Sequence, residues 1–133
     1  MSVEIFCAGF LSLMLFALGL AVSIERGRKN YLTGTPADST EVLYKLIRAH
    51  SNASEYLPIL LGLFLYFALT ASSQTIRYII VATTFARVLH AAALILGGDL
   101  RRFNGMRFVG GLGTYMGGGL LGAALILRAF KAA

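Results

Sequence analysis

Four long apolar stretches limit what this chain can fold into. They run from about Val3 to Ile24, Tyr44 to Leu69, Ile76 to Leu96 and Phe108 to Phe130. Each reaches the ~20 apolar residues that an α-helix needs to cross ~30 Å of hydrocarbon. With 57% hydrophobic residues and a mean hydropathy of +0.74, the chain is far more apolar than an ordinary soluble domain. We therefore predict an all-α integral membrane protein, a four-helix bundle that forms a single domain over residues 1–133.

The basic residues, which give the chain a net charge of +6, are distributed as a membrane topology requires. The loops predicted at 25–43 and 97–107 carry Arg26, Arg28, Lys29, Arg101, Arg102 and Arg107. The positive-inside rule places both loops in the cytoplasm and both termini outside it. The first apolar stretch is too long for a cleavable signal peptide and lacks its basic start, so we expect a retained helix. Because topology and ligand attraction account for the charge, we expect no nucleic-acid partner.

Polar side chains gather where the second stretch begins, in the segment Arg48-Ala-His-Ser-Asn52-Ala-Ser-Glu55-Tyr56-Leu-Pro58. Arg48, Asn52 and Glu55 follow the i, i+4, i+7 spacing of one helical face, and Tyr56 lies beside them. Ionisable groups inside a membrane are costly and usually serve a function. The segment therefore predicts a binding site close to the cytoplasmic interface.

Further cations at the same membrane level indicate what this site binds. Arg87 and His90 share one face of the third helix, and both basic loops lie at that end. Glu55 and Asp99 cannot neutralise all of these cations, so the surplus favours an anionic ligand with more than one acidic group. The alternative interpretation is an ion pair that only fixes helix packing, which suits a lone Glu/Arg pair better.

Other kinds of site find little support in the sequence. His90 has only His50 as a companion and no carboxylate at metal-ligand spacing, so we predict no metal site. The single cysteine, Cys7, lies in the first apolar stretch, which excludes an intrachain disulfide. No serine has the base and orienting partner of a catalytic nucleophile.

Small and aromatic residues of the apolar stretches are interpreted as packing groups. The glycine pairs Gly113/Gly117 and Gly118/Gly122 allow close helix approach. This approach fits packing within one chain and packing between subunits equally well. Four tyrosines are interpreted as interface or packing aromatics: Tyr44, Tyr66, Tyr78 and Tyr115.

In these motifs the chain resembles the membrane-associated proteins in eicosanoid and glutathione metabolism, the MAPEG family, particularly its small bacterial members. The resemblance covers almost the whole chain. It includes Arg-Ala-His-x-Asn-x-x-Glu-Tyr-x-Pro from Arg48, Ala-Arg-x-x-His ending at His90, and the two basic loops. It implies a homotrimer, expected in the bacterial inner membrane, with glutathione sites between neighbouring subunits near the cytoplasmic face. It also implies glutathione transferase or peroxidase activity toward hydrophobic electrophiles or hydroperoxides.

The resemblance assigns binding roles to individual residues. It implies that Arg48 and Arg28 contact the carboxylates of glutathione and that Asn52 hydrogen-bonds its peptide group. Glu55 would hold the γ-glutamyl ammonium, and Tyr56 would pack and bond beside it. The expected partners are a second copy of the chain, glutathione, a hydrophobic small molecule and membrane lipid.

For catalysis, the resemblance points to an arginine at the start of the fourth helix that stabilises the glutathione thiolate. Arg101 matches this position by its spacing from His90, and Arg102 follows it. Arg87 and His90 would come from the adjoining subunit.

One departure from the family pattern is Leu94, which stands where family enzymes often have a tyrosine. It motivates an alternative, a non-catalytic membrane binding or assembly protein with the same fold. A small transporter or channel is a third hypothesis, disfavoured because the polar groups cluster at one membrane face.

Overall fold

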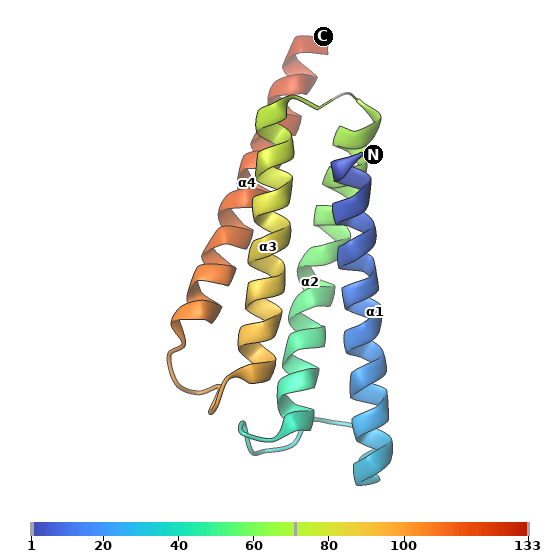
Figure 1. Cartoon of the computed structure of the whole chain (residues 1–133), viewed down its shortest axis with the longest axis vertical. Coiled ribbons are helices and arrows are strands. Elements are labelled where there is room, and N and C mark those ends of the chain that lie inside the picture. The colour runs from blue at the N-terminus through green and yellow to red at the C-terminus, as the bar shows by residue number, and fades with distance from the viewer. Residues whose placement is uncertain (1, 71, 133) are drawn as a thin grey trace.

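The protein is described here by a computed structural model that covers residues 2–70 and 72–132. This part of the chain forms four long helices, α1 (Val3–Lys29), α2 (Val42–Leu69), α3 (Gln74–Leu96) and α4 (Gly105–Ala132). All four are long and apolar enough to cross a membrane. They run alternately up and down, so the start of α1 and the end of α4 lie at the same end of the bundle (Figure 1). The predicted all-α fold with four candidate membrane spans is thereby confirmed.

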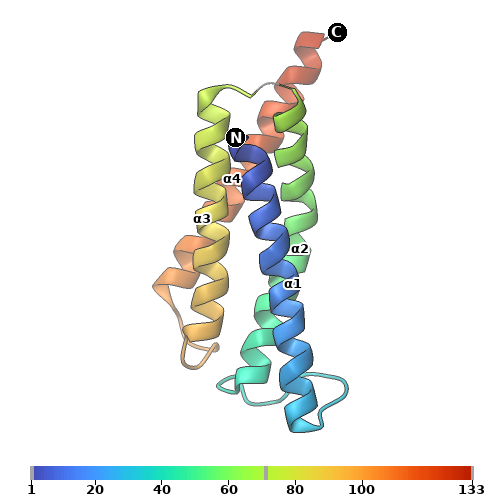
Figure 2. The ribbon, with the colours of Figure 1, turned by 45° about the vertical axis from the view of Figure 1, so that its right-hand side comes forward.

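The helices pack mainly in two pairs, α1 along α2 and α3 along α4, and the contact of α2 with α3 joins the pairs. Within the described residues α1 and α4 do not touch. Figure 2 shows α4 slanting behind the other helices. The bundle core contains fully buried side chains such as Leu11, Leu57, Phe64, Ile80 and Leu121. Large apolar side chains also cover the outer faces, as expected of helices whose solvent is lipid.

Two helices extend beyond the apolar stretches from which they were predicted, α1 at its end and α4 at its start. α1 continues from Ile24 to Lys29, where Asn30 adopts the left-handed conformation (φ 51°) and its N–H bonds to the carbonyls of the last turn. The basic residues of this last turn stabilise the helix, because their positive charges lie at the negative end of the helix dipole. α4 begins at Gly105, and the Asn104 side chain accepts a hydrogen bond from the backbone N–H of Arg107 (3.0 Å). Arg107 therefore lies in the first turn of α4 and not in a loop.

Glycines of α4 allow it to lie close against α3. A Cβ added to Gly110 would stand 2.7 Å from the backbone nitrogen of His90, and one added to Gly117 would stand 1.9 Å from Thr83 Oγ1. A Cβ at Gly113 would also be too close to α3. By contrast, Gly122 has nothing within 4 Å of an added Cβ. The first predicted glycine pair, Gly113/Gly117, is therefore used within the chain.

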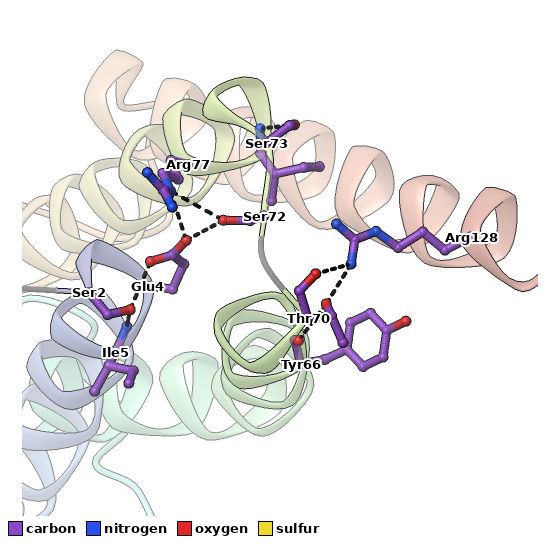
Figure 3. Close-up of polar contacts among 10 residues, drawn as sticks. Ser2, Glu4, Ile5, Tyr66, Thr70, Ser72, Ser73, Arg77 and Arg128 are labelled. Atoms are coloured by element: carbon purple, nitrogen blue, oxygen red, sulfur yellow. Dashed lines mark hydrogen bonds and ion pairs between the residues drawn. The ribbon is translucent and has the colours of Figure 1, made fainter. Parts of the chain in front are cut away.

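The bundle is tied together at the end where α1 starts and α4 finishes (Figure 3). The buried carboxylate of Glu4 accepts hydrogen bonds from Ser2 and Ser72, and from Nε of Arg77 at 3.1 Å. These bonds join the start of α1 to the start of α3. Arg128 of α4 donates to the backbone carbonyl of Thr70 (3.1 Å) at the end of α2.

Candidate functional site

The opposite end of the bundle, which we call the cationic end, is closed by the loops 30–41 and 97–104. A cavity of about 520 Å³ opens there between α2, α3 and the start of α4. We call it the cationic cavity, and it is lined by Tyr44, Arg48, Asn52, His90, Leu94, Leu100 and Arg107. The lining offers two guanidinium groups, an imidazole, an amide and a phenol, and it includes no carboxylate. A ligand with several anionic groups fits this charge distribution.

One face of α2 supplies three of these side chains. Tyr44, Arg48 and Asn52 follow each other at i, i+4, i+8, so they form a single row along the cavity. Arg48 is exposed and makes no hydrogen bond or ion pair with the described residues. Its guanidinium is thus available to a ligand. Tyr44 was predicted to be an interface or packing aromatic and not a site residue. Its position four residues before Arg48 was the signal that it shares this face of α2.

Arg107 is the second cation of the cavity, and its side chain is held in place. The guanidinium donates to the backbone carbonyls of Leu100 (2.8 Å) and Arg102 (2.9 Å). Arg107 was predicted only as a basic residue of the loop 97–107. The signal that was missed is Asn104-Gly105, an N-cap residue at the point where α4 starts.

His90 faces the cavity from α3 with a defined tautomer. Its Nδ1 lies 2.9 Å from the backbone carbonyl oxygen of Arg107. Because a carbonyl only accepts, Nδ1 carries the proton, and in the neutral ring Nε2 is then the acceptor. The same contact fixes the start of α4 against α3.

Arg87 lies behind the cavity, inside the bundle. Only 1% of it is exposed. Its Nη2 donates to the side-chain oxygen (3.0 Å) and the backbone carbonyl (3.3 Å) of Asn52 in the same chain. Its guanidinium also lies 5.3 Å from the ring centre of Tyr56, whereas its Nε has no hydrogen-bond partner among the described residues. Arg87 therefore orients Asn52 within one subunit, and this contact requires no neighbouring chain.

The two predicted catalytic residues, Arg101 and Arg102, lie in the loop 97–104. Arg101 is exposed, and its guanidinium donates to the backbone carbonyl of Ala37 (3.2 Å) in the first loop. Arg101 does not line the cationic cavity. Arg102 is also exposed and lines an adjacent cavity of about 500 Å³, together with Asp99 and Arg107.

The two loops of the cationic end are linked through Asp99. Its carboxylate accepts hydrogen bonds from the Ser39 hydroxyl and from the backbone N–H of Arg101 (2.9 Å). The Ser39 bond is the main cause that holds the pKa of Asp99 below its usual value. The pKa of Asp38 is lowered in the same way, chiefly by the backbone N–H of Thr40. Both carboxylates thus hold the loop structure, and neither lines the cationic cavity.

The remaining predicted site residues lie outside the cavity. The side chain of Arg28 is 75% exposed at the end of α1 and pairs loosely with Glu25 at 3.9 Å. Glu55 is exposed on α2 and forms no hydrogen bond or ion pair with the described residues. Tyr56 is turned toward α4, where its hydroxyl lies 3.0 Å from that of Tyr115. Within the described residues, no group of three or more potential metal ligands was found.

A comparison with protein families matches residues 5–127 to the MAPEG family. A search of curated proteins finds no match to the sequence. The family match spans nearly the whole chain and confirms the resemblance seen in the motifs of α2 and α3.

Proposed function

The chain belongs to the MAPEG family, which includes glutathione-dependent enzymes. We propose that it binds glutathione and either joins it to hydrophobic electrophiles or uses it to reduce hydrophobic hydroperoxides. The observation that carries this proposal is the cationic cavity, which has two guanidinium groups and no carboxylate in its lining. Glutathione brings two carboxylates, a peptide backbone and a thiol to such a site.

The cavity side chains suggest a place for each part of glutathione. Arg48 pairs with one carboxylate, and Asn52, oriented by Arg87, hydrogen-bonds the peptide. We assign the role of thiolate stabiliser to Arg107, because Arg107 lines the cavity, whereas Arg101 contacts the first loop. A neighbouring cation lowers the pKa of a thiol and so increases the nucleophilic thiolate at neutral pH.

The thiolate then reacts with the second substrate. With an electrophile it forms a sulfur–carbon bond and the leaving group departs with its electron pair. With a hydroperoxide the thiolate attacks the terminal oxygen, so a sulfur–oxygen bond forms as the oxygen–oxygen bond breaks, and the released alkoxide takes up a proton. The thiol of a second glutathione then displaces the hydroxyl group of this sulfenic acid, which gives the disulfide and water. Nε2 of His90, the acceptor nitrogen of the neutral ring, is suited to accept the thiol proton.

The family resemblance implies a homotrimer, and an exposed charge on α2 favours a site that a neighbouring subunit completes. Glu55 is exposed within a membrane helix and has no partner among the described residues of one chain. A lipid-facing carboxylate is costly, so a neighbouring subunit or a ligand ammonium is expected to cover it. We place Arg28 and Glu55 at this subunit boundary, with Glu55 toward the γ-glutamyl ammonium.

The basic residues at the cationic end support an orientation with this end in the cytoplasm of a bacterial inner membrane. The glutathione site would then open to the compartment in which glutathione keeps thiols reduced.

Calorimetric titration of the detergent-solubilised protein with glutathione tests the binding site. We expect saturable binding that is lost in Arg48→Ala, Arg107→Ala and Glu55→Ala, with unchanged oligomer size. Arg101→Ala is the matched control, because it removes an arginine from the same end but not from the cavity. Binding that survives in both Arg48→Ala and Arg107→Ala would overturn the site.

Leu94 favours a second candidate function, a non-catalytic binding or assembly protein. It is buried and brings methyl groups to the wall of the cationic cavity, where a hydroxyl could have assisted the thiolate. Conjugation assays with a range of electrophiles distinguish the two functions. Turnover that disappears in Arg107→Ala supports the enzyme, and glutathione binding without turnover supports the second candidate.

A further inference from the structure

Two cavities lie on either side of Tyr115 along α4. The first, of about 330 Å³, shares His90 and Arg107 with the cationic cavity and is otherwise lined mainly by apolar groups such as Phe103, Phe108 and Leu112. The second, of about 200 Å³, lies further along α4 and is bounded by apolar residues of α2 and by Gly118 and Gly119. Tyr115 contributes to the lining of both. Tyr115 therefore stands between a cavity that adjoins the cationic cavity and a second apolar cavity.

The interruption is a contact between two tyrosines. The hydroxyls of Tyr115 on α4 and Tyr56 on α2 are 3.0 Å apart. The two rings meet edge to face, with centroids 5.7 Å apart and planes inclined by 65°. This pair, which we call the tyrosine bar, spans the gap between α2 and α4.

The two halves of the tyrosine bar are held to different degrees. Tyr56 is half-buried and lies against the guanidinium of Arg87, which Asn52 fixes in turn. Tyr115 is 61% exposed, and its hydrogen bond and its ring contact within the described residues are both with Tyr56. Tyr115 is therefore the half that a substitution can remove without disturbing the bundle core.

We propose that the tyrosine bar sets the maximum length of the hydrophobic substrate that the protein accepts. This inference rests on the proposed function, because the occupant is the alkyl tail of a molecule whose reacting end lies beside Arg107 and His90. Arg107 and Tyr115 are eight residues apart on α4, which corresponds to ~12 Å along the helix. A tail that fits this distance stays in the first cavity, whereas a longer tail meets the bar. Without Tyr115, the second cavity becomes its continuation.

The test uses S-alkylglutathiones, which join the proposed cosubstrate to a tail of chosen length. Binding of S-methyl-, S-hexyl- and S-dodecylglutathione is measured by calorimetry for the wild type, Tyr115→Ala, Tyr115→Phe and Tyr78→Ala. Tyr78 is the matched control because it is a similarly exposed tyrosine (66%) on another helix. It also corrects for partition of the long tails into detergent. Tyr115→Phe keeps the ring and removes only the hydroxyl bond.

We expect the wild-type Kd to fall from the methyl to the hexyl compound by up to about fourfold for each buried methylene. The dodecyl compound should bind no more tightly than the hexyl compound. In Tyr115→Ala its Kd should fall by at least about tenfold, a gain equivalent to about two buried methylenes. Tyr115→Phe should show a smaller gain, and Tyr78→Ala none.

Three results would overturn the inference. Two of them contradict only the tyrosine bar, and the third contradicts glutathione binding itself. A wild-type affinity that keeps rising to the dodecyl compound, or a Tyr115→Ala affinity equal to that of the wild type, contradicts the tyrosine bar while leaving glutathione binding intact. Failure of S-methylglutathione to bind the wild type contradicts the proposed function itself, and the inference fails with it.

Discussion

Substituting Gly117 by alanine tests the close contact of α3 and α4 that holds His90 against the start of α4. The new Cβ would stand 1.9 Å from Thr83 Oγ1 and 3.0 Å from Thr83 Cβ. Thr83 cannot yield freely, because it is buried and its hydroxyl donates to the carbonyl of Ile79 at 2.7 Å. Overpacking of this kind costs about 1–3 kcal/mol. The better helix propensity of alanine returns up to about 1 kcal/mol. We therefore expect the free energy of unfolding to fall by up to about 2 kcal/mol once the full propensity gain is subtracted.

The assay is reversible denaturation in mixed micelles, followed by circular dichroism. Gly119→Ala is the matched control, because nothing lies within 4 Å of an added Cβ there. It should be neutral or slightly stabilising. Adding Thr83→Ala to Gly117→Ala should recover part of the lost stability, because it removes Oγ1 and Cγ2 of Thr83, which lie 1.9 and 3.1 Å from the new Cβ. The reasoning is refuted if Gly117→Ala is as stable as Gly119→Ala, or if the double variant shows no recovery.

Three further predictions concern polar contacts. Asn52→Leu removes the side-chain acceptor of the buried Arg87 guanidinium and leaves it only the backbone carbonyl, so it should lower the free energy of unfolding by about 3 kcal/mol in the same denaturation assay. Glu4→Ala removes the carboxylate that joins α1 to α3 and should cost about 2 kcal/mol, with α1 becoming accessible to proteolysis before α2. The pKa of Asp99 is lower in the folded protein, so its contribution to stability is complete above its usual pKa of about 4 and is lost as the pH falls through the folded value. The protection of the loop amides at 30–41 and 97–104, measured as the exchange rate relative to the intrinsic rate at the same pH, should therefore fall on acidification in the wild type, whereas Asp99→Asn should show low protection at every pH.

The fold could be predicted from the sequence because the length of an apolar stretch identifies a membrane-spanning helix even when its ends are misplaced by a few residues. Apolar stretches of membrane-spanning length define helices whatever their packing, so the order and number of spans in the described residues agree with the prediction. Helix ends were less accurate, because hydropathy reports where the membrane ends and not where the helix ends. α1 continues through charged residues to Lys29, and α4 starts before its apolar stretch, which brings Arg107 into the first turn.

The site was predicted only in part, because helical periodicity gives the face of a helix but not its neighbour. Arg48, Asn52 and His90 do meet in one cavity. The pattern could not tell that Arg87 is buried against Asn52 of its own chain. Nor could it reveal the contact of Tyr56 with Tyr115, since the two residues are 59 positions apart in the sequence.

The most direct test of the central claim is a measurement of the ionisation of bound glutathione. Thiolate formation is followed by ultraviolet difference absorbance at neutral pH, in a Cys7→Ala background that removes the chain's own thiol. Because a free thiol has a pKa of about 8.5, unbound glutathione is mostly protonated under these conditions. The account predicts a stoichiometric thiolate signal in the wild type and in Arg101→Ala, and its loss in Arg107→Ala. An absent wild-type signal, or an Arg107→Ala signal equal to that of the wild type, would contradict the claim that the cationic cavity binds and activates glutathione.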